Sequence, residues 1–185
     1  MNITVYCASS LGHDPDFAQE TRKLGAWIGA HRHTLVYGGT NVGLMGLLSD
    51  VVLDAGGRVV GVLPDILADR EPPSGRLTEF YRVETMAQRK AKMIELGDVF
   101  IALPGGPGTL EELSEIMSLV KLGTPPGYLF LLNVNGYYDE LVVSFERMLE
   151  HGFMTPEMRS YLEVATSADE LAAALSVMGR GSARP

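Results

Sequence analysis

The chain has 185 residues, of which 46% are hydrophobic and 21% are charged, and its formal net charge at pH 7 is -8. This composition excludes a disordered chain, and an acidic balance without a basic run argues against nucleic acid and against an anionic membrane surface as partners. The single cysteine, Cys7, rules out an internal disulfide and fits a reducing compartment. Because the N-terminus lacks the pattern of a signal peptide and no stretch is long and apolar enough to span a membrane, we expect a soluble cytoplasmic protein.

Apolar runs rich in valine and isoleucine alternate along the chain with segments of helical period. In chain order, the pattern predicts a strand at 3–8, a helix at 15–31, a strand at 34–39, a helix at 43–55, a strand at 58–63, a short strand at 79–83, a helix at 84–96, a strand at 98–103, a helix at 109–122, a strand at 128–133, a helix at 138–151, a strand at 162–165 and a helix at 168–178. Residues 64–78 form a Pro/Gly-rich loop that is long enough to suggest a function. We expect residues 1–178 to form a single domain and 179–185 to be a disordered tail.

The predicted strands are continuous apolar runs rather than alternating ones, which indicates a sheet covered on both faces. Together with the strand–helix alternation, this predicts an α/β fold: a Rossmann-like, doubly wound, mostly parallel sheet with helices on both faces. In such sheets, ligands bind beyond the carboxyl ends of the strands. Three of those ends carry turns of small residues, "CASSLG", "YGGTNVG" and "LPGGPGT". Small residues let a ligand approach the backbone closely, so these turns form the candidate binding region.

The turn after the predicted strand 98–103 is the strongest candidate for an anion site. It supplies Gly105, Gly106, Gly108 and Thr109 at the point where the next helix begins. Unpaired N–H groups and the helix dipole favour an anion there, and the Thr109 hydroxyl adds a donor. The alternative is a plain tight turn in which Thr109 caps the helix, because glycine turns of this kind are common.

Two familiar phosphate motifs do not fit this turn. Counted from Gly106, the third glycine of a dinucleotide-binding G-x-G-x-x-G falls on Glu111, and the Gly-Lys-Ser/Thr of a P-loop is missing. We therefore expect neither an NAD-type dinucleotide nor Mg-ATP in its usual cradle. The second glycine turn, which holds Gly39, and the first strand end, where Ser9 and Ser10 could donate hydrogen bonds, lie at the same edge of the sheet.

A carboxylate falls inside the apolar stripe of the predicted helix 109–122. At about 100° per residue, Glu112 lies between Ile116 and Leu119, whereas Glu111 faces the opposite side. Burying an unpaired charge is costly, so a glutamate in this position indicates a functional site more often than a requirement of the core. The alternative is a structural glutamate that pairs with a local group.

The predicted helix 84–96 shows a similar anomaly with basic residues. Arg89 lies within the apolar stripe that includes Met86 and Met93, and Lys90 borders it. Arginine suits a bidentate contact with a carboxylate or a phosphate. Inward cations and an inward carboxylate on helices that flank one strand predict a shared polar site. The alternative is that both basic side chains pass their apolar neighbours and reach solvent.

Metal and thiol chemistry are not expected. The chain has four histidines, and their spacing does not match metal ligands, so we predict no zinc site and no other metal. Cys7 has no nearby base in the sequence. We expect it to be a small buried residue at a strand end rather than a nucleophile.

The segment "PGGPGTLEE" resembles the PGGxGTxxE motif of the Lonely Guy (LOG) family, the cytokinin riboside 5'-monophosphate phosphoribohydrolases, whose members have often been labelled lysine decarboxylases. The resemblance covers nearly the whole chain. The segments "CASS", "YGGTNVGLMG", "MAQRK" and "NVNGYYDEL" also occur in the order found in the family. The pairing of PGGxGTxxE with M-x-x-R-K makes the resemblance specific.

The resemblance implies a hydrolase that cleaves the N-glycosidic bond of purine nucleoside 5'-monophosphates, of cytokinin type or AMP, to free base and ribose 5-phosphate, without a cofactor. It also implies that Arg89 and Glu112 are the catalytic pair, the same two residues that the helical pattern selects. The substrate contacts that it implies are Glu71, Lys90 and, in the glycine turn, Gly105, Gly106, Gly108, Thr109 and Glu111. Ser9, Gly39 and Met86 complete the residues that we expect to bind the substrate. Because the family forms dimers with sites near the interface, we expect at least a homodimer that acts on a small nucleotide.

Two positions depart from the family pattern. Pro107 occupies the variable motif position, where aromatic residues are frequent, and Ala87 replaces a histidine that is common in the family's M-H-x-R-K. Neither change removes a catalytic group. Both bear on the preference for the base or for its N6 substituent.

Three other functions are compatible with the sequence. A non-catalytic nucleotide or molybdenum-cofactor carrier could use the same fold, because a fold does not fix a function. A pyridoxal-phosphate-dependent decarboxylase would need a Schiff-base lysine, for which Lys90 is the inward candidate, although no partner for the cofactor's ring is visible. A structural protein would leave Arg89 and Glu112 with no role beyond an ion pair.

Overall fold

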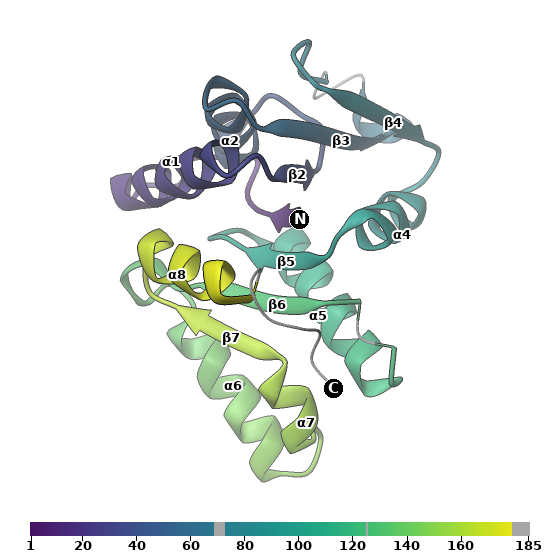
Figure 1. Ribbon diagram of the computed structural model, residues 1–185. Coiled ribbons are helices and arrows are strands. Elements are labelled where there is room, and N and C mark those ends of the chain that lie inside the picture. Colours follow the sequence, from purple (N-terminus) through teal and green to yellow (C-terminus); the bar gives the residue numbers. More distant parts are fainter. Residues whose placement is uncertain (69–72, 125, 179–185) are drawn as a thin grey trace.

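The computed structural model describes residues 1–68, 73–124 and 126–178 (Figure 1). The strands are β1 (Asn2–Tyr6), β2 (Thr34–Tyr37), β3 (Arg58–Pro64), β4 (Glu79–Val83), β5 (Val99–Ala102), β6 (Tyr128–Leu132) and β7 (Leu162–Ala165). The helices are α1 (Pro15–Ala30), α2 (Gly43–Asp54), α3 (Asp65–Ala68), α4 (Met86–Leu96), α5 (Pro107–Lys121), the 3-10 helix η1 (Val134–Gly136), α6 (Asp139–Glu150), α7 (Pro156–Ser160) and α8 (Ala168–Met178). Every predicted strand and helix is present, with ends that differ by a few residues.

The strands form one seven-stranded sheet in the order β4-β3-β2-β1-β5-β6-β7, and every neighbouring pair is parallel. The predicted α/β fold with a doubly wound, Rossmann-like sheet is therefore confirmed. From β1 the chain winds outward to β4 at one edge, and from β5 it winds outward to β7 at the other. The strand order thus reverses between β1 and β5, and ligands of open α/β sheets bind at such a point, beyond the carboxyl ends of the strands.

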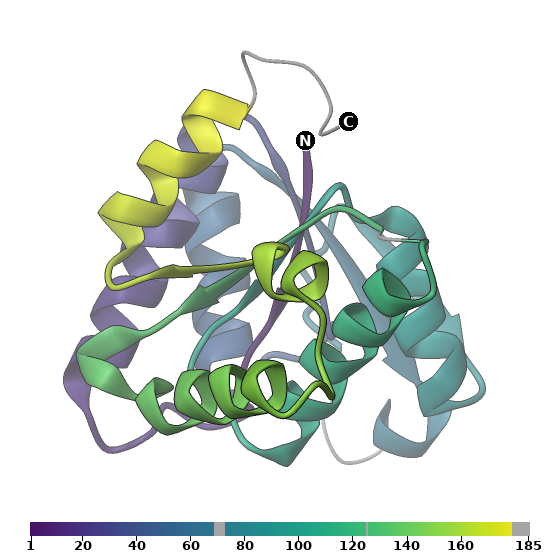
Figure 2. The same ribbon diagram turned by 90° about the horizontal axis from the view of Figure 1, so that it is seen from below.

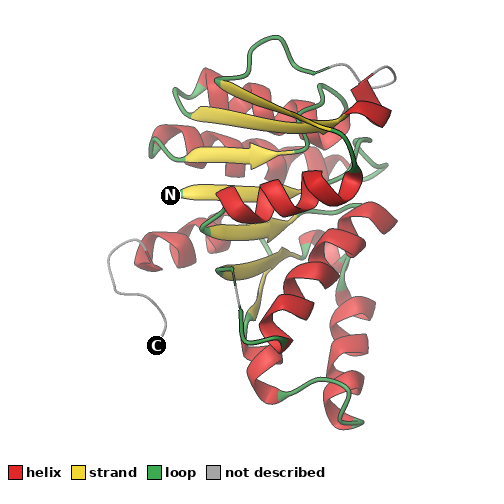
Figure 3. Cartoon of the chain, turned by 90° about the vertical axis from the view of Figure 1, so that its right-hand side faces the viewer, coloured by secondary structure: helices red, strands yellow, loops and turns green. Residues whose placement is uncertain are grey.

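Helices cover both faces of this sheet (Figures 2 and 3). The core on one face packs α1, α2 and α8 against the strands, and the core on the other face packs α4, α5, α6 and α7. Successive residues of a strand belong to opposite cores: Val5 packs with the first group and Tyr6 with the second. The strands are apolar on both sides for this reason, which explains the continuous apolar runs in the sequence.

Two short α-helices, and the 3-10 helix η1, were not predicted. Helix α3 lies inside the segment 64–78, which was predicted to be a loop throughout, and α7 follows α6. Both are too short to produce a periodic pattern, and α7 is marked instead by Thr155, which caps it, and by Pro156 at its first position. Helix α5 begins at Pro107, two residues before the predicted start, because proline fits the first turn of a helix.

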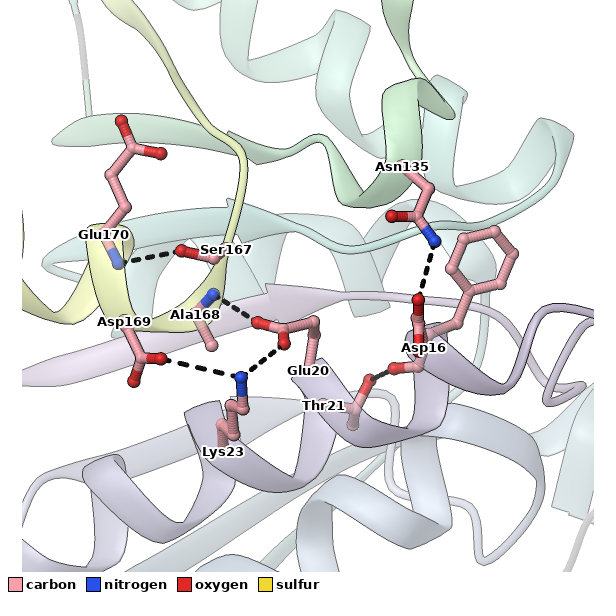
Figure 4. Close-up of polar contacts among 10 residues, drawn as sticks. Asp16, Glu20, Thr21, Lys23, Asn135, Ser167, Ala168, Asp169 and Glu170 are labelled. Carbon is pink, nitrogen blue, oxygen red and sulfur yellow. Dashed lines mark hydrogen bonds and ion pairs between the residues drawn. The ribbon is translucent and has the colours of Figure 1, made fainter.

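A buried carboxylate joins α1 to α8 (Figure 4). Glu20 on α1 is 8% exposed, and its Oε2 accepts the N–H of Ala168 at 2.6 Å, at the start of α8. Its Oε1 receives the Lys23 ammonium at 2.8 Å. A carboxylate at the N-terminus of a helix satisfies an otherwise unpaired donor and complements the helix dipole. This contact fixes the position of α8 on the same face as α1.

Among the described helices, none is both long enough and apolar enough to cross a bilayer.

Candidate active site

A cavity of about 340 Å³ opens at the carboxyl ends of β1 and β5, where the strand order reverses. It is lined by Cys7, Ala8, Ser9, Ser10, Met45, Leu67, Met86, Arg89, Gly106, Pro107, Gly108, Thr109, Glu111 and Glu112. Residues from the end of β1, from α2 and α3, from α4 and from the start of α5 therefore meet in one place. The topology thus brings together the polar residues that the sequence singled out on separate segments.

The floor of the cavity is the start of α5. Gly106 is the N-cap, Pro107 has no N–H to leave unpaired, and no side chain caps the helix. Thr109 is 4% exposed and lines the cavity. A Cβ at position 105 would lie 2.1 Å from the Thr109 hydroxyl, so Gly105 makes room for that side chain. The interpretation of Thr109 as the helix cap is therefore wrong, and its hydroxyl and the first N–H groups of α5 are placed for an anion.

Arg89 and Glu112 lie next to each other in the lining of the cavity. Arg89 Nη2 lies 3.7 Å from Glu112 Oε1, and the two residues are 9% and 7% exposed. The predicted inward orientation of both side chains is confirmed. The 3.7 Å separation is longer than a direct hydrogen bond, and Arg89 Nε is buried without a hydrogen-bond partner in the described part of the chain. The guanidinium thus retains donor capacity for a ligand.

Burial dominates the electrostatics of Glu112. Desolvation raises the pKa of its carboxyl from 4.5 to about 7, while the Arg89 charge acts in the opposite direction. Glu111 and Glu115 add to the rise, and Lys90 opposes it. A carboxyl with this pKa exchanges protons near neutral pH, which suits a general acid or base. The site therefore holds an acid–base group next to an arginine and a helix N-terminus that no side chain caps.

The backbone beneath Arg89 contributes a residue that sequence reasoning missed. A Cβ at Gly38, directly after β2, would lie 2.2 Å from Arg89 Nη2 and 2.9 Å from Met45 Sδ. Glycine is therefore required for the guanidinium to lie against this turn. The sequence prediction named the next residue, Gly39, and the signal that could have identified Gly38 was the paired glycine in "YGGTNVG".

The predicted contact residues fall into three groups: those that line the cavity, those that lie outside its lining, and one that lies outside the described residues. Ser9, Met86, Gly106, Gly108, Thr109 and Glu111 line the cavity with the Arg89–Glu112 pair. Gly105 supports the turn from behind, and Gly39 lies outside the lining, where its carbonyl accepts the Ser74 N–H at 3.2 Å. Glu71 lies outside the described residues.

Lys90 does not line the cavity. Its ammonium lies 2.8 Å from Glu111 and 2.9 Å from Glu115, so it links α4 to α5 beside the site. Hydrogen bonds to these two carboxylates raise the pKa of Lys90. A pyridoxal phosphate Schiff base needs a free amine facing the cofactor, and the lining contains no lysine. The residues present therefore do not fit that cofactor.

Two further predictions concern Cys7 and metal ligands. Cys7 is buried at the end of β1, as predicted, and burial raises the pKa of its thiol far above neutral pH, so it is not a thiolate nucleophile. Within the described residues, the structure contains no group of three or more His, Cys, Asp or Glu side chains that could hold a metal ion.

Comparison with known proteins agrees with this geometry. Residues 45–175 match the family described as "Possible lysine decarboxylase". The chain is 42% identical over 169 residues to the cytokinin riboside 5'-monophosphate phosphoribohydrolase LOG1 of Arabidopsis thaliana, covering 91% of this chain and 79% of that protein. The chain belongs to the LOG family. A LOG-family relative from Rhodococcoides fascians, named cytokinin riboside 5'-monophosphate phosphoribohydrolase, is 42% identical over 175 residues, covering 94% and 88% of the two chains. The resemblance inferred from the sequence motifs is therefore confirmed.

Solved structures extend the comparison to the fold. The molybdenum cofactor carrier protein of Chlamydomonas reinhardtii superposes with a TM-score of 0.72 over 97% of this chain and 98% of its own, at 21% identity. The molybdenum cofactor binding protein of Rippkaea orientalis gives a TM-score of 0.70, also at 21% identity, over 96% and 94% of the two chains. At this identity, the likeness shows that this chain has the same fold as the two solved structures.

Proposed function

We propose that this chain hydrolyses the N-glycosidic bond of purine nucleoside 5'-monophosphates, of cytokinin type or AMP, to release the free base and ribose 5-phosphate. The observation that carries the proposal is the buried Arg89–Glu112 pair, which lies in one cavity with the glycine turn at the start of α5. The relatives named as cytokinin riboside 5'-monophosphate phosphoribohydrolases support the same activity. The chain is then an enzyme of the N-glycosidic hydrolase class.

The start of α5 is the proposed phosphate site. The N–H groups of Gly106, Gly108 and Thr109 and the Thr109 hydroxyl belong to a helix N-terminus that no side chain caps. A dianionic phosphate gains from these donors and from the helix dipole. Anchored there, the ribose extends toward Glu112, one helical turn further along α5.

Glu112 and Arg89 are assigned to the chemical step. Departure of the base leaves positive charge on the anomeric carbon and ring oxygen, as in other glycosyl cleavages. Ionised Glu112 stabilises this charge and accepts a proton from the water whose oxygen bonds to the anomeric carbon. The released nitrogen of the base takes up a proton from solvent, and Glu112 then returns its own proton to solvent, so that the sum of the reaction is the addition of one water molecule. Arg89 favours the ionised carboxylate and orients it, and its guanidinium, which belongs to the lining of the cavity, contacts the ribose phosphate.

The first test incubates the purified protein with AMP and with isopentenyladenosine monophosphate and measures free base by chromatography. Glu112→Gln keeps the shape of the side chain but removes its charge, so we expect base release to fall by at least about 100-fold. Circular dichroism confirms that the variant is folded. Full turnover by the folded variant would contradict the assignment of Glu112.

The same experiment distinguishes the other functions. Tight AMP binding without release of base, unaffected by Glu112→Gln, would favour a non-catalytic carrier over the hydrolase.

Because Lys90 is paired with two carboxylates and lies outside the lining, we expect the purified protein to lack the absorbance of pyridoxal phosphate. The ratio of the rates for the two substrates measures the preference for the N6 substituent.

The proposal includes a homodimer in the cytoplasm, with the nucleotide as its small-molecule partner. Leu122 is 73% exposed and Phe153 is 79% exposed, and an interface between two copies that covered them would gain from their burial. Sedimentation equilibrium measures the mass in solution, and a monomer at micromolar concentration would contradict the homodimer.

A further inference from the structure

The segment 133–139, "NVNGYYD", connects β6 to α6 and is closed by its own side chains. Asn133 is buried, its Nδ2 donates to Asp139 Oδ1 at 2.7 Å and its Oδ1 accepts the N–H of Tyr138 at 2.7 Å. A Cβ on Gly136 would lie 2.6 Å from the Asp139 carboxylate, so the loop closes this tightly only with glycine there. The segment belongs to a motif that carried the family resemblance, yet it contributes no residue to the Arg89–Glu112 cavity.

The same segment is tied to the start of α1. The side-chain amide nitrogen of Asn135 donates to Asp14 at 3.0 Å. It also donates to Asp16 at 2.9 Å, the contact drawn in Figure 4. Asn135 itself has a left-handed backbone with φ of 50°, a conformation that asparagine tolerates better than most residues. Together with its internal bonds, this attachment makes the segment 133–139 a defined support rather than a loose connection.

Two tyrosines of this segment donate hydrogen bonds to the glycine turn. The Tyr138 hydroxyl donates to the carbonyl of Leu103 at 2.6 Å, and the Tyr137 hydroxyl donates to the carbonyl of Gly105 at 2.7 Å. Their rings meet edge to face, with centroids 4.8 Å apart. Burial raises the pKa of Tyr138, so its hydroxyl remains a donor throughout the neutral range. The two bonds hold the backbone on either side of Pro104.

The bond to Gly105 also orients the next N–H group. A trans peptide is planar, so its carbonyl and its N–H point in opposite directions, and the described chain contains no cis peptide. Tyr137 and Gly105 line a neighbouring cavity of about 440 Å³, whereas Gly106 lines both this cavity and the one that holds Glu112. We propose that Tyr137 is a positioning residue whose hydroxyl turns the Gly106 N–H toward the phosphate site. The proposal rests on the proposed function, because it assigns the anion at this turn to the substrate's phosphate.

The turn needs such support because of its composition. Gly105 and Gly106 are adjacent glycines, and no heavy atom lies within 4 Å of the point where a Gly106 Cβ would stand. Without an external bond, this peptide samples many orientations, and only some of them present the N–H to a phosphate. A hydrogen bond of ordinary strength changes such a population by about fivefold to tenfold.

The decisive variant is Tyr137→Phe, which removes one hydroxyl and keeps the ring. We expect the KM for AMP to rise about fivefold to tenfold with kcat changed by less than about twofold, because phosphate contacts are made equally in the ground state and the transition state. Inhibition by inorganic phosphate and by ribose 5-phosphate should weaken by the same factor, while inhibition by adenine stays unchanged. The matched control is Tyr81→Phe, which removes a hydroxyl that bonds to Glu79 on β4 and should change none of these values.

A binding experiment separates this proposal from the hydrolase proposal. Calorimetry compares AMP binding to Glu112→Gln with binding to the double variant Glu112→Gln/Tyr137→Phe. Weaker binding by the double variant supports the positioning role even if the wild-type protein releases no adenine, a result that would overturn the hydrolase proposal alone. Unchanged AMP affinity and unchanged phosphate inhibition overturn the positioning role. Equal weakening toward adenine and phosphate also overturns it, because a general structural defect produces that result.

Discussion

Glu112 shows how the surroundings of one residue set its chemistry. Its carboxyl is buried, and the resulting desolvation outweighs the nearby Arg89 charge, so its pKa rises from 4.5 to about 7. The same burial that makes Glu112 a suitable acid–base group also lowers the stability of the folded chain when this residue ionises. An anion bound at the start of α5 would also change the pKa of Glu112, because its charge interacts with the carboxylate.

The stability of the protein should report this pKa directly. A group whose pKa is raised on folding contributes stability below its unfolded pKa, and that contribution is lost as the pH rises through the folded value. For Glu112, the rise from 4.5 to about 7 corresponds to about 3 kcal/mol, which should disappear between pH 4.5 and pH 8. We therefore expect the free energy of unfolding of the wild type to fall by about this amount relative to Glu112→Gln over that range. Urea titrations at several pH values measure the difference, and a difference that is independent of pH would contradict the burial argument.

Gly38 provides a second prediction at a single residue. In Gly38→Ala, the new Cβ would lie 2.2 Å from Arg89 Nη2, so the guanidinium must leave its present position beside Glu112. Misplacement of a catalytic group by about 1 Å costs about 100-fold in rate, and we expect a loss of this size in kcat/KM for AMP. Gly75→Ala is the matched control, because a Cβ there meets no atom within 4 Å. Equal activities of the two variants would show that Arg89 does not depend on this turn.

At the scale of elements, the site depends on how α4 and α5 pack. Each helix presents one charged residue inward, Arg89 from α4 and Glu112 from α5, and their outer sides are joined through the Lys90 ammonium. The lysine bridges two carboxylates one turn apart on α5, Glu111 and Glu115, which fixes the relative position of the helices. The sequence indicated that these cations and carboxylates share a region, but the spacing did not tell which cation faces which carboxylate.

The contact between α1 and α8 is a separate prediction at this scale. Glu20→Ala leaves the N–H of Ala168 without its carboxylate, and a buried donor without a partner costs about 1–3 kcal/mol. We expect a loss of about 2 kcal/mol in the free energy of unfolding, measured by urea denaturation. Gln19→Ala, an exposed substitution on the same helix, should stay within about 0.5 kcal/mol of the wild type. If Glu20→Ala is no less stable than this control, the buried carboxylate does not hold α8 in place.

At the scale of the whole molecule, the site exists because of the strand order. The end of β1 and the start of α5 are about a hundred residues apart in the chain. They meet because β1 and β5 are neighbours, as the register of Thr4 opposite Phe100 shows. The turn after β5 and the turn after β1 thus form two walls of one cavity. Helices on both faces bury the strands, which leaves the carboxyl edge of the sheet as the place where polar groups can gather.

Much of this arrangement was predictable from the sequence. Continuous apolar strands alternating with periodic helices determine a parallel α/β sheet, and the helical period of α4 and α5 determines that Arg89 and Glu112 point inward. The glycine turn and Thr109 identified the start of α5 as the part of that helix where we propose the phosphate binds. These features are local, because spacing along the chain sets which side of an element a residue occupies.

The tertiary structure alone decided the contacts between distant segments. The Arg89–Glu112 distance, the closeness of Gly38 to the guanidinium, the pairing of Lys90 outside the cavity and the bond from Tyr137 to Gly105 each join residues that no local pattern relates. Such contacts depend on the order of the strands and on how the connecting segments pack against them, and both are fixed only when the whole core is formed. The sequence determined by itself which residues could act, and the tertiary structure decided which of them meet.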